Sequence, residues 1–184
     1  MSGHTLQEVD VAERVLGVLA DVGFPPDRLV LEVTEGVLID DPAVGERLQR
    51  LRAAGVRIAL DDFGTGWSSL DYLRRFPVDM LKLDRSFVAG LASGGAGEAV
   101  PAAVVQLAAT LRLEVVAEGV ETLHQAERLS RLGEMHAQGY LFGRAEPAHA
   151  QALLVGSGRT PVGGELSPVA VAESSAELVP APRG

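Results

Sequence analysis

Two adjacent aspartates, Asp61 and Asp62, are the residues of this sequence best placed to do chemistry. They follow the apolar run from Val56 to Leu60, which predicts a buried strand, and Gly64 and Gly66 come soon after. Successive side chains of a strand point in opposite directions, so the two carboxylates cannot both enter a dry core. Because the glycines let the backbone turn and approach a ligand, the pattern favours a divalent cation with oxygen ligands. A turn that is merely capped by aspartates is the alternative.

Four more polar residues interrupt or end other apolar segments: Glu32, Lys82, Glu118 and Gln138. Each of them also has a simpler interpretation. Glu32 could lie at a sheet edge, Lys82 could reach solvent along its aliphatic stem, and Gln138 could be a buried amide bonded to backbone. Glu118 and Glu121 could cap the following helix, where their negative charges would interact favourably with the positive end of the helix dipole. Taken singly, these residues leave both interpretations open.

The elements that must position these residues alternate between strand and helix. Apolar patterns predict strands over residues 29–34, 56–60, 80–84, 115–118 and 137–142. Helical patterns cover residues 9–22, 42–54, 69–75, 101–111, 122–132 and 147–155, and Pro101 is expected to open the fourth helix. Thr122 and Gln125 have the spacing of a capping box at the head of the fifth. Such alternation is typical of an α/β fold with parallel strands, either an open sheet or a closed barrel.

Functional residues of such folds collect at the carboxyl ends of the strands. The residues expected to meet at one rim are Glu32, Asp61, Asp62, Lys82 and Glu118. Unpaired carboxylates so close together would repel one another, and metal ions resolve that conflict. With a lysine nearby, the set could position and activate a water for attack on phosphorus or on a carbonyl carbon. The residues alone thus predict a metal-dependent hydrolase or lyase of unknown substrate.

The composition is that of an ordinary globular domain. The 184 residues are 47% hydrophobic and 22% charged, and they include no cysteine, which excludes disulfides and thiolate metal sites. The net charge of −9 disfavours binding to nucleic acid polymers. The sequence shows neither a signal peptide nor a membrane-spanning run, so we expect a cytoplasmic protein. From residue 156 to residue 184, small and polar residues dominate, which predicts a disordered tail.

Five stretches of the sequence resemble, in order, the motifs of the EAL domain family, the bacterial cyclic di-GMP phosphodiesterases. They are Leu31–Glu35, Asp61–Leu70, Phe76–Val88, Val115–Thr122 and Gln138–Arg144, with Trp67 where Tyr is more usual. The resemblance runs from about Leu6 to Val155. Residues 1–155 are therefore interpreted as the C-terminal portion of an EAL domain, and residues 156–184 as its tail.

The resemblance implies a modified TIM barrel that hydrolyses one phosphodiester of cyclic di-GMP to the linear dinucleotide with Mg²⁺ or Mn²⁺. The implied metal ligands are Glu32, Asp61, Asp62 and Glu118. The residues implied to orient and activate the attacking water are Lys82, Glu118 and Gln138. The implied substrate contacts are Asp62 and Glu121, and the implied support of the loop over residues 62–69 is Glu35.

The family's namesake Glu-Ala-Leu motif is absent from this sequence, as is a strand ending in Asn; both supply metal ligands in the family. With five of eight strands, we expect a partial barrel with two exposed sheet edges and an open apolar interior. Such a chain would need self-association or the missing N-terminal barrel half, and alone it is expected to be weakly active or inactive. A start assigned too late or a degraded gene is favoured over a genuine short protein. The alternative function is a non-catalytic cyclic di-GMP-binding or protein-interaction module.

Overall fold

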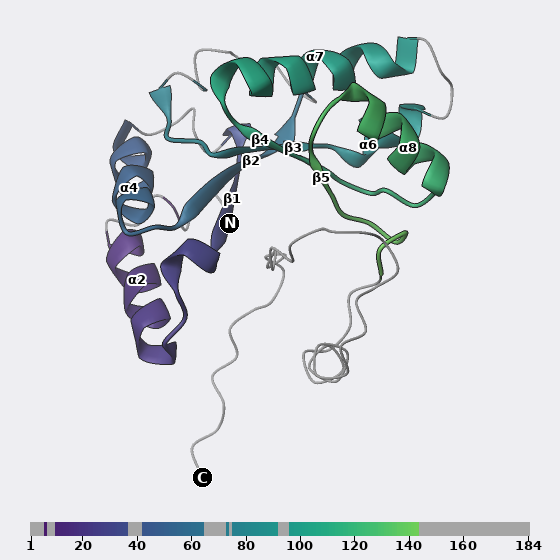
Figure 1. Cartoon of the computed structure of the whole chain (residues 1–184). Coiled ribbons are helices and arrows are strands. Elements are labelled where there is room, and N and C mark those ends of the chain that lie inside the picture. The colour runs from purple at the N-terminus through teal and green to yellow at the C-terminus, as the bar shows by residue number, and fades with distance from the viewer. Residues whose placement is uncertain are drawn as a thin grey trace.

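The computed structural model of the chain describes residues 6, 10–36, 42–64, 73, 75–91 and 96–143. Within them, five parallel strands form one sheet in chain order (Figure 1). The strands are β1 (Val30–Thr34), β2 (Arg57–Phe63), β3 (Met80–Leu83), β4 (Glu114–Ala117) and β5 (His136–Ala137). The predicted α/β architecture with parallel strands is confirmed. The helices predicted over residues 69–75 and 147–155 and the tail over 156–184 lie largely or wholly outside the described residues.

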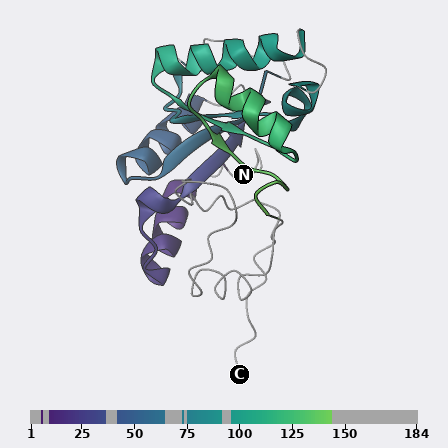
Figure 2. The same ribbon diagram turned by 45° about the vertical axis from the view of Figure 1, so that its right-hand side comes forward.

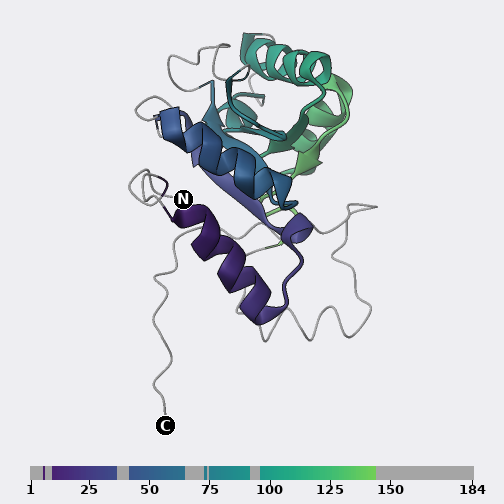
Figure 3. The same cartoon turned by 90° about the vertical axis from the view of Figure 1, so that its left-hand side faces the viewer.

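The helices lie along the outer side of the curved sheet (Figure 2). They are α2 (Val11–Val22), the short 3₁₀ helix η1 (Pro26–Arg28), α4 (Pro42–Ala53), α6 (Arg85–Gly90), α7 (Ala96–Leu111) and α8 (Leu123–Leu132). Helix α4 packs against β2, and α7 packs against β3 and β4. Helix α2 packs against α4, and the two run side by side in Figure 3. The inner face of the sheet is therefore left for the functional residues.

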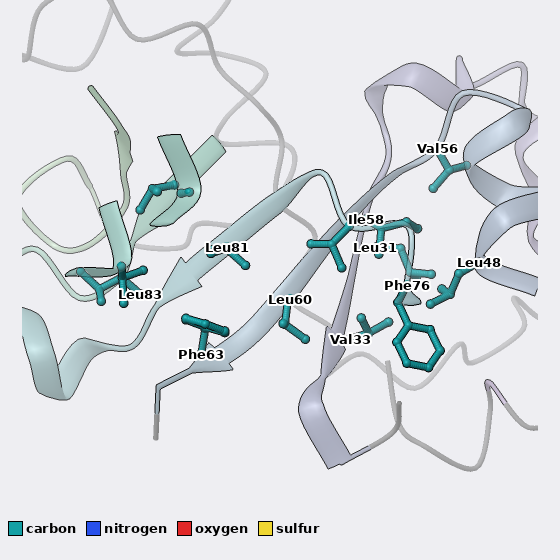
Figure 4. Packing of buried hydrophobic residues seen from close by; sticks show 14 of the residues in the cluster. Leu31, Val33, Leu48, Val56, Ile58, Leu60, Phe63, Phe76, Leu81 and Leu83 are labelled. Carbon is teal, nitrogen blue, oxygen red and sulfur yellow. The ribbon is translucent and has the colours of Figure 1, made fainter. Parts of the chain in front are cut away.

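The main core lies between the outer face of the sheet and the helices that cover it, with α4 on one side and α6, α7 and α8 on the other. Val33, Ile58 and Leu60 are at most 1% exposed and lie on the same side of the sheet as Leu48 of α4 (Figure 4). Burying a side chain of this size contributes roughly 1.5–3 kcal/mol. Because side chains alternate along a strand, this packing turns the residues between them, such as Glu32, to the inner face.

The inner face carries an apolar layer, formed by one residue from each of the first four strands: Val30, Ala59, Met80 and Val116. These side chains are between 1% and 7% exposed. The expectation of an open apolar interior is therefore wrong for this layer. Curvature of the sheet brings the four side chains together. The residues two positions before and after them along the strands face the same side and are largely polar. Charged side chains therefore flank the apolar layer on both sides along the strand direction.

Two strand ends differ from the predicted ones by more than one residue. Strand β2 continues through the two aspartates to Phe63 instead of ending at Leu60. Strand β5 ends at Ala137 rather than at residue 142. The chain turns at Gly139, whose φ of 152° and whose contact with the backbone of Val120 leave no room for a side chain. Beyond this turn the backbone bonds to the segment after β4 instead of extending the sheet.

The helices between β3 and β4 also differ from the prediction. Helix α7 begins at Ala96, not at Pro101, which lies inside the helix. Pro101 is the sixth residue of this helix, beyond its first turn, so it has no N–H to donate to the carbonyl of residue 97 and the helix lacks that internal hydrogen bond. Helix α6 was not predicted; it begins after Asp84, whose side chain accepts a hydrogen bond from the backbone N–H of Ser86.

Several helix ends follow the sequence prediction. Helix α2 ends at Gly23, which has a left-handed conformation with φ of 66°. At the head of α8, Gln125 N–H donates to Thr122 Oγ1 and Thr122 N–H donates to Gln125 Oε1, so the predicted capping box is confirmed. None of the helices in the described part of the chain is long and apolar enough to cross a membrane.

Candidate metal and hydrolysis site

Lys82 lies at the centre of carboxylates contributed by three other parts of the sheet. Its ammonium nitrogen Nζ lies 2.7 Å from Glu32 Oε1 and 3.2 Å from Asp61 Oδ1, and it also contacts Glu118 Oε1. The lysine side chain is 5% exposed, and the three acidic side chains are 12–24% exposed. We call these four residues the Lys82 cluster. The structure thus brings four of the five residues predicted to meet at one rim, all except Asp62, into direct contact.

A β-bulge explains how two successive aspartates serve the same rim. Between the paired positions of Leu60 and Phe63, Asp61 and Asp62 together oppose the single residue Lys82. Asp62 has a φ of 57°, a left-handed conformation that aspartate adopts more readily than most residues. Its backbone N–H donates to Asp61 Oδ1 at 3.1 Å. The bulge keeps Asp62 off the apolar face of the sheet and leaves it exposed at the rim.

Gln138 completes the cluster from the far side. Its side-chain Nε2 donates to Glu118 Oε1 at 3.0 Å, so both side chains face the inner surface. The Gln138 backbone accepts from Val120 N–H and donates to Ala117 O, which fixes the residue next to β4. The simpler interpretations of Glu118 as a helix cap and of Gln138 as a backbone-bonded amide are therefore wrong.

The electrostatics of the rim follow from burial and mutual repulsion. Burial alone would lower the pKa of Lys82, but hydrogen bonds to Glu118 and Glu32 outweigh it and raise that pKa, so the lysine stays charged. Burial raises the pKa of Glu118, with Asp61 and Glu32 adding repulsion. The pKa of Asp62 is also raised, first by burial and then by the charges of Asp61 and Asp84.

Two other predicted site residues lie at the edge of the rim. Glu35 follows β1 and is close enough to Asp62 that its charge helps to raise the pKa of Asp62. Glu35 was predicted to support the loop over residues 62–69, and residues 65–69 of that loop lie outside the described residues. Glu121 is exposed between β4 and α8, and its backbone N–H donates to Gln125 Oε1 at 2.8 Å. The structure therefore places Glu121 at the rim without a role of its own in the Lys82 cluster.

The donor chemistry of the Lys82 cluster fits a divalent cation. Carboxylate oxygens are the ligands that Mg²⁺, Ca²⁺ and Mn²⁺ prefer, and three of them already gather around one positive charge. In the described ranges, however, no three acidic or histidine side chains are grouped so as to hold a metal ion. The ammonium of Lys82 lies at the point that the carboxylates share.

A second ion cluster, which the sequence analysis missed, lies at the amino-terminal end of the same inner face. Arg57 Nη2 lies 2.5 Å from Glu114 Oε1, and His136 Nε2 lies 3.3 Å from Glu114 Oε2. The hydrogen bond from Arg57 lowers the pKa of Glu114. We call these residues the Arg57 cluster. The two-residue alternation of side chains along a strand could have revealed this cluster, because Glu114 lies four residues before Glu118 and therefore on the same face.

Comparison with known proteins assigns the chain to a family. Residues 1–145 match the EAL domain model. The chain belongs to the EAL domain family. The bifunctional diguanylate cyclase/cyclic di-GMP phosphodiesterase MucR of Pseudomonas aeruginosa is 45% identical over 149 residues. That match spans 80% of this EAL domain chain but only 22% of MucR.

Solved structures of EAL proteins have the same fold. A structure described as the PaMucR phosphodiesterase in complex with c-di-GMP superposes with a TM-score of 0.77 at 43% identity, over 82% of this chain and 62% of that one. The manganese and cyclic di-GMP complex of Klebsiella pneumoniae BlrP1 superposes with a TM-score of 0.69 at 37% identity, over 76% of this chain and 36% of that one. The five-stranded sheet of this EAL domain chain is thus part of a TIM-like barrel.

Proposed function

We propose that this chain carries the catalytic rim of a metal-dependent phosphodiesterase that hydrolyses cyclic di-GMP to the linear dinucleotide. The observation that carries the proposal is the Lys82 cluster, in which three carboxylates from separate strands meet one buried ammonium. The family membership and the cyclic di-GMP complexes of similar proteins support the choice of substrate. The chain spans less than two thirds of these relatives, so the reaction is proposed for the domain that the chain forms part of.

In this proposal, Glu32, Asp61, Asp62 and Glu118 hold Mg²⁺ or Mn²⁺. A divalent cation bound there supplies positive charge to a phosphate and favours ionisation of water. Lys82 and Glu118 orient the attacking water, and Glu118 accepts its proton as the oxygen adds to phosphorus. One P–O bond of the ring breaks, and the released ribose oxygen takes a proton from solvent to become a hydroxyl of the linear dinucleotide. Burial raises the pKa of Glu118, which makes it a stronger base than an ordinary exposed carboxylate.

Gln138 holds Glu118 in place through its amide, which donates to the carboxylate at 3.0 Å. Asp62 and Glu121 contact the substrate from the rim, where both side chains are exposed. Glu35 supports the loop that follows Asp62. A single substitution can test each of these assignments.

The test is a pair of substitutions on the same face of β4 and its extension. Glu118→Gln removes the proposed base, whereas Glu114→Gln removes a carboxylate four residues away in the Arg57 cluster. We expect calorimetry to show cyclic di-GMP binding that requires Mn²⁺ or Mg²⁺. Formation of the linear dinucleotide, even at a slow rate, would demonstrate phosphodiesterase activity. Glu118→Gln should lower that rate by about 100-fold or more, and Glu114→Gln should leave it unchanged.

The non-catalytic module stays the second candidate because the ammonium of Lys82 occupies the point that the carboxylates share. Cation-dependent binding without product in the same samples would favour this module. If cyclic di-GMP neither binds nor turns over with either cation, both functions are wrong. Comparing Mg²⁺ with Mn²⁺ at equal concentration decides which ion the rim prefers.

A further inference from the structure

The Lys82 ammonium makes ion pairs with the oxygens that a metal ion would need. It contacts Oε1 of Glu32, Oδ1 of Asp61 and Oε1 of Glu118 at once. The lysine is 4% exposed, so its charge is compensated almost entirely by these three groups rather than by water. One positive charge is therefore shared by three carboxylates.

A divalent cation and this ammonium cannot share the same oxygens at close range. Two positive charges a few ångströms apart repel strongly in a site shielded from water. Metal binding therefore requires Lys82 to give up contacts that it makes here.

Two of the carboxylates are held by other donors as well. Glu118 Oε1 also accepts from Gln138 Nε2 at 3.0 Å, and Asp61 Oδ1 also accepts from the Asp62 N–H at 3.1 Å. These bonds do not involve the lysine. Glu118 and Asp61 can thus keep their orientation toward the rim when the ammonium moves away.

We propose that Lys82 is a built-in counter-cation, which holds the rim together without metal and competes with the divalent cation for the carboxylates of Glu32, Asp61 and Glu118. This inference rests on the proposed function only in using the same site. It sets the metal affinity of the rim: the lysine stabilises the metal-free protein, and it weakens metal binding because the cation must displace it. The fold is therefore kept when the metal is absent.

The test uses Lys82→Met, which keeps the length of the side chain and removes its charge. Mn²⁺ is titrated into the full chain by calorimetry in the absence of nucleotide, and thermal unfolding is followed with EDTA and with saturating Mn²⁺. We expect Lys82→Met to bind Mn²⁺ at least about tenfold more tightly than the wild type, equivalent to about 1.4 kcal/mol. Its Tm should fall below that of the wild type in EDTA, and Mn²⁺ should raise its Tm by more than it raises that of the wild type.

Arg57→Met is the matched control, because it removes a cation from the same inner face in the Arg57 cluster. We expect it to leave the Mn²⁺ affinity unchanged. Should Lys82→Met fail to fold even with Mn²⁺, Lys82→Arg decides, because it keeps the charge and should bind Mn²⁺ no more tightly than the wild type.

Equal or weaker Mn²⁺ binding by Lys82→Met would overturn the proposal, as would tighter binding by Lys82→Arg. Both outcomes are read without cyclic di-GMP. They can therefore be distinguished from a failure of the proposed function. That failure would appear as a lack of nucleotide binding and turnover, while Lys82→Met would still bind Mn²⁺ more tightly than the wild type.

Discussion

The two ion clusters on the inner face of the sheet have similar parts and different surroundings. The Lys82 cluster joins one cation to three carboxylates with a lysine side chain that is 5% exposed. The Arg57 cluster joins one arginine to one carboxylate and a histidine, with side chains that are 29–45% exposed. Burial leaves the first cluster with an excess of negative charge that water cannot screen, while the second is nearly balanced and solvated. The comparison teaches that the charge excess and the burial, not the presence of an ion pair, distinguish the end of the sheet that we propose to be functional.

Removing the buried cation should have the largest effect. Lys82→Met leaves three carboxylates without their shared partner, and we expect it to lower the free energy of unfolding in EDTA by about 3–5 kcal/mol. Mutual repulsion then raises the carboxylate pKa values in the folded state, so the folded protein binds more protons than the unfolded one. The stability of the variant therefore falls as the pH rises. Its loss of unfolding free energy relative to the wild type should become smaller as the pH is lowered from about 8 to about 5. Urea denaturation across this range measures it, and Arg57→Met, with an expected loss of about 1 kcal/mol or less, is the control.

Breaking the apolar layer between the clusters should come next. Met80 is 2% exposed and lies between the two levels of charge. We expect Met80→Ala to cost about 2–4 kcal/mol, from lost burial and from the cavity that remains. Chemical denaturation is the measurement, and Val100→Ala, at a helix position that is 42% exposed, should cost less than about 0.5 kcal/mol. Equal losses for the two substitutions would show that the layer does not separate the clusters.

The bulge at the functional end offers a smaller test. Asp62 has a φ of 57°, which a β-branched residue adopts only under strain. We expect Asp62→Val to destabilise the protein by about 1–3 kcal/mol and Asp62→Asn by much less, because Asn tolerates this conformation. Thermal unfolding of the two variants at one pH compares them. If both unfold alike, the strain of the bulge is not what distinguishes this end of β2.

The smallest effect is expected at the exposed cluster. The pKa of Glu114 is lowered by its hydrogen bond with Arg57, so its stabilisation is present above the ordinary carboxyl pKa and is lost as the pH falls through the lower folded value. Because the side chain is 45% exposed, we expect Glu114→Gln to cost less than about 1 kcal/mol at neutral pH. The difference from the wild type should vanish in strong acid and shrink in high salt. Unfolding at low and neutral pH, with and without salt, would detect a larger or salt-independent loss.

The sequence by itself predicted the five strands, helices α2, α4, α7 and α8, and the residues that we propose carry the chemistry. Local patterns are enough for this, because the apolar alternation of β1 and the capping box at Thr122 depend only on neighbours along the chain. The same patterns placed Glu32, Lys82 and Glu118 where strands end or are interrupted. Their order along the chain also matched the motifs of the family.

Only the tertiary structure decided how those residues meet. The register of β2 against β3 creates a bulge that no local sequence pattern predicts. This bulge places both aspartates opposite Lys82. The turn at Gly139 shortened β5 because the backbone of Val120 offered it hydrogen bonds. The pairing of Arg57 with Glu114 likewise depends on strands far apart in the sequence. Distances between such residues are set by register and curvature, which are properties of the assembled sheet and not of any one segment.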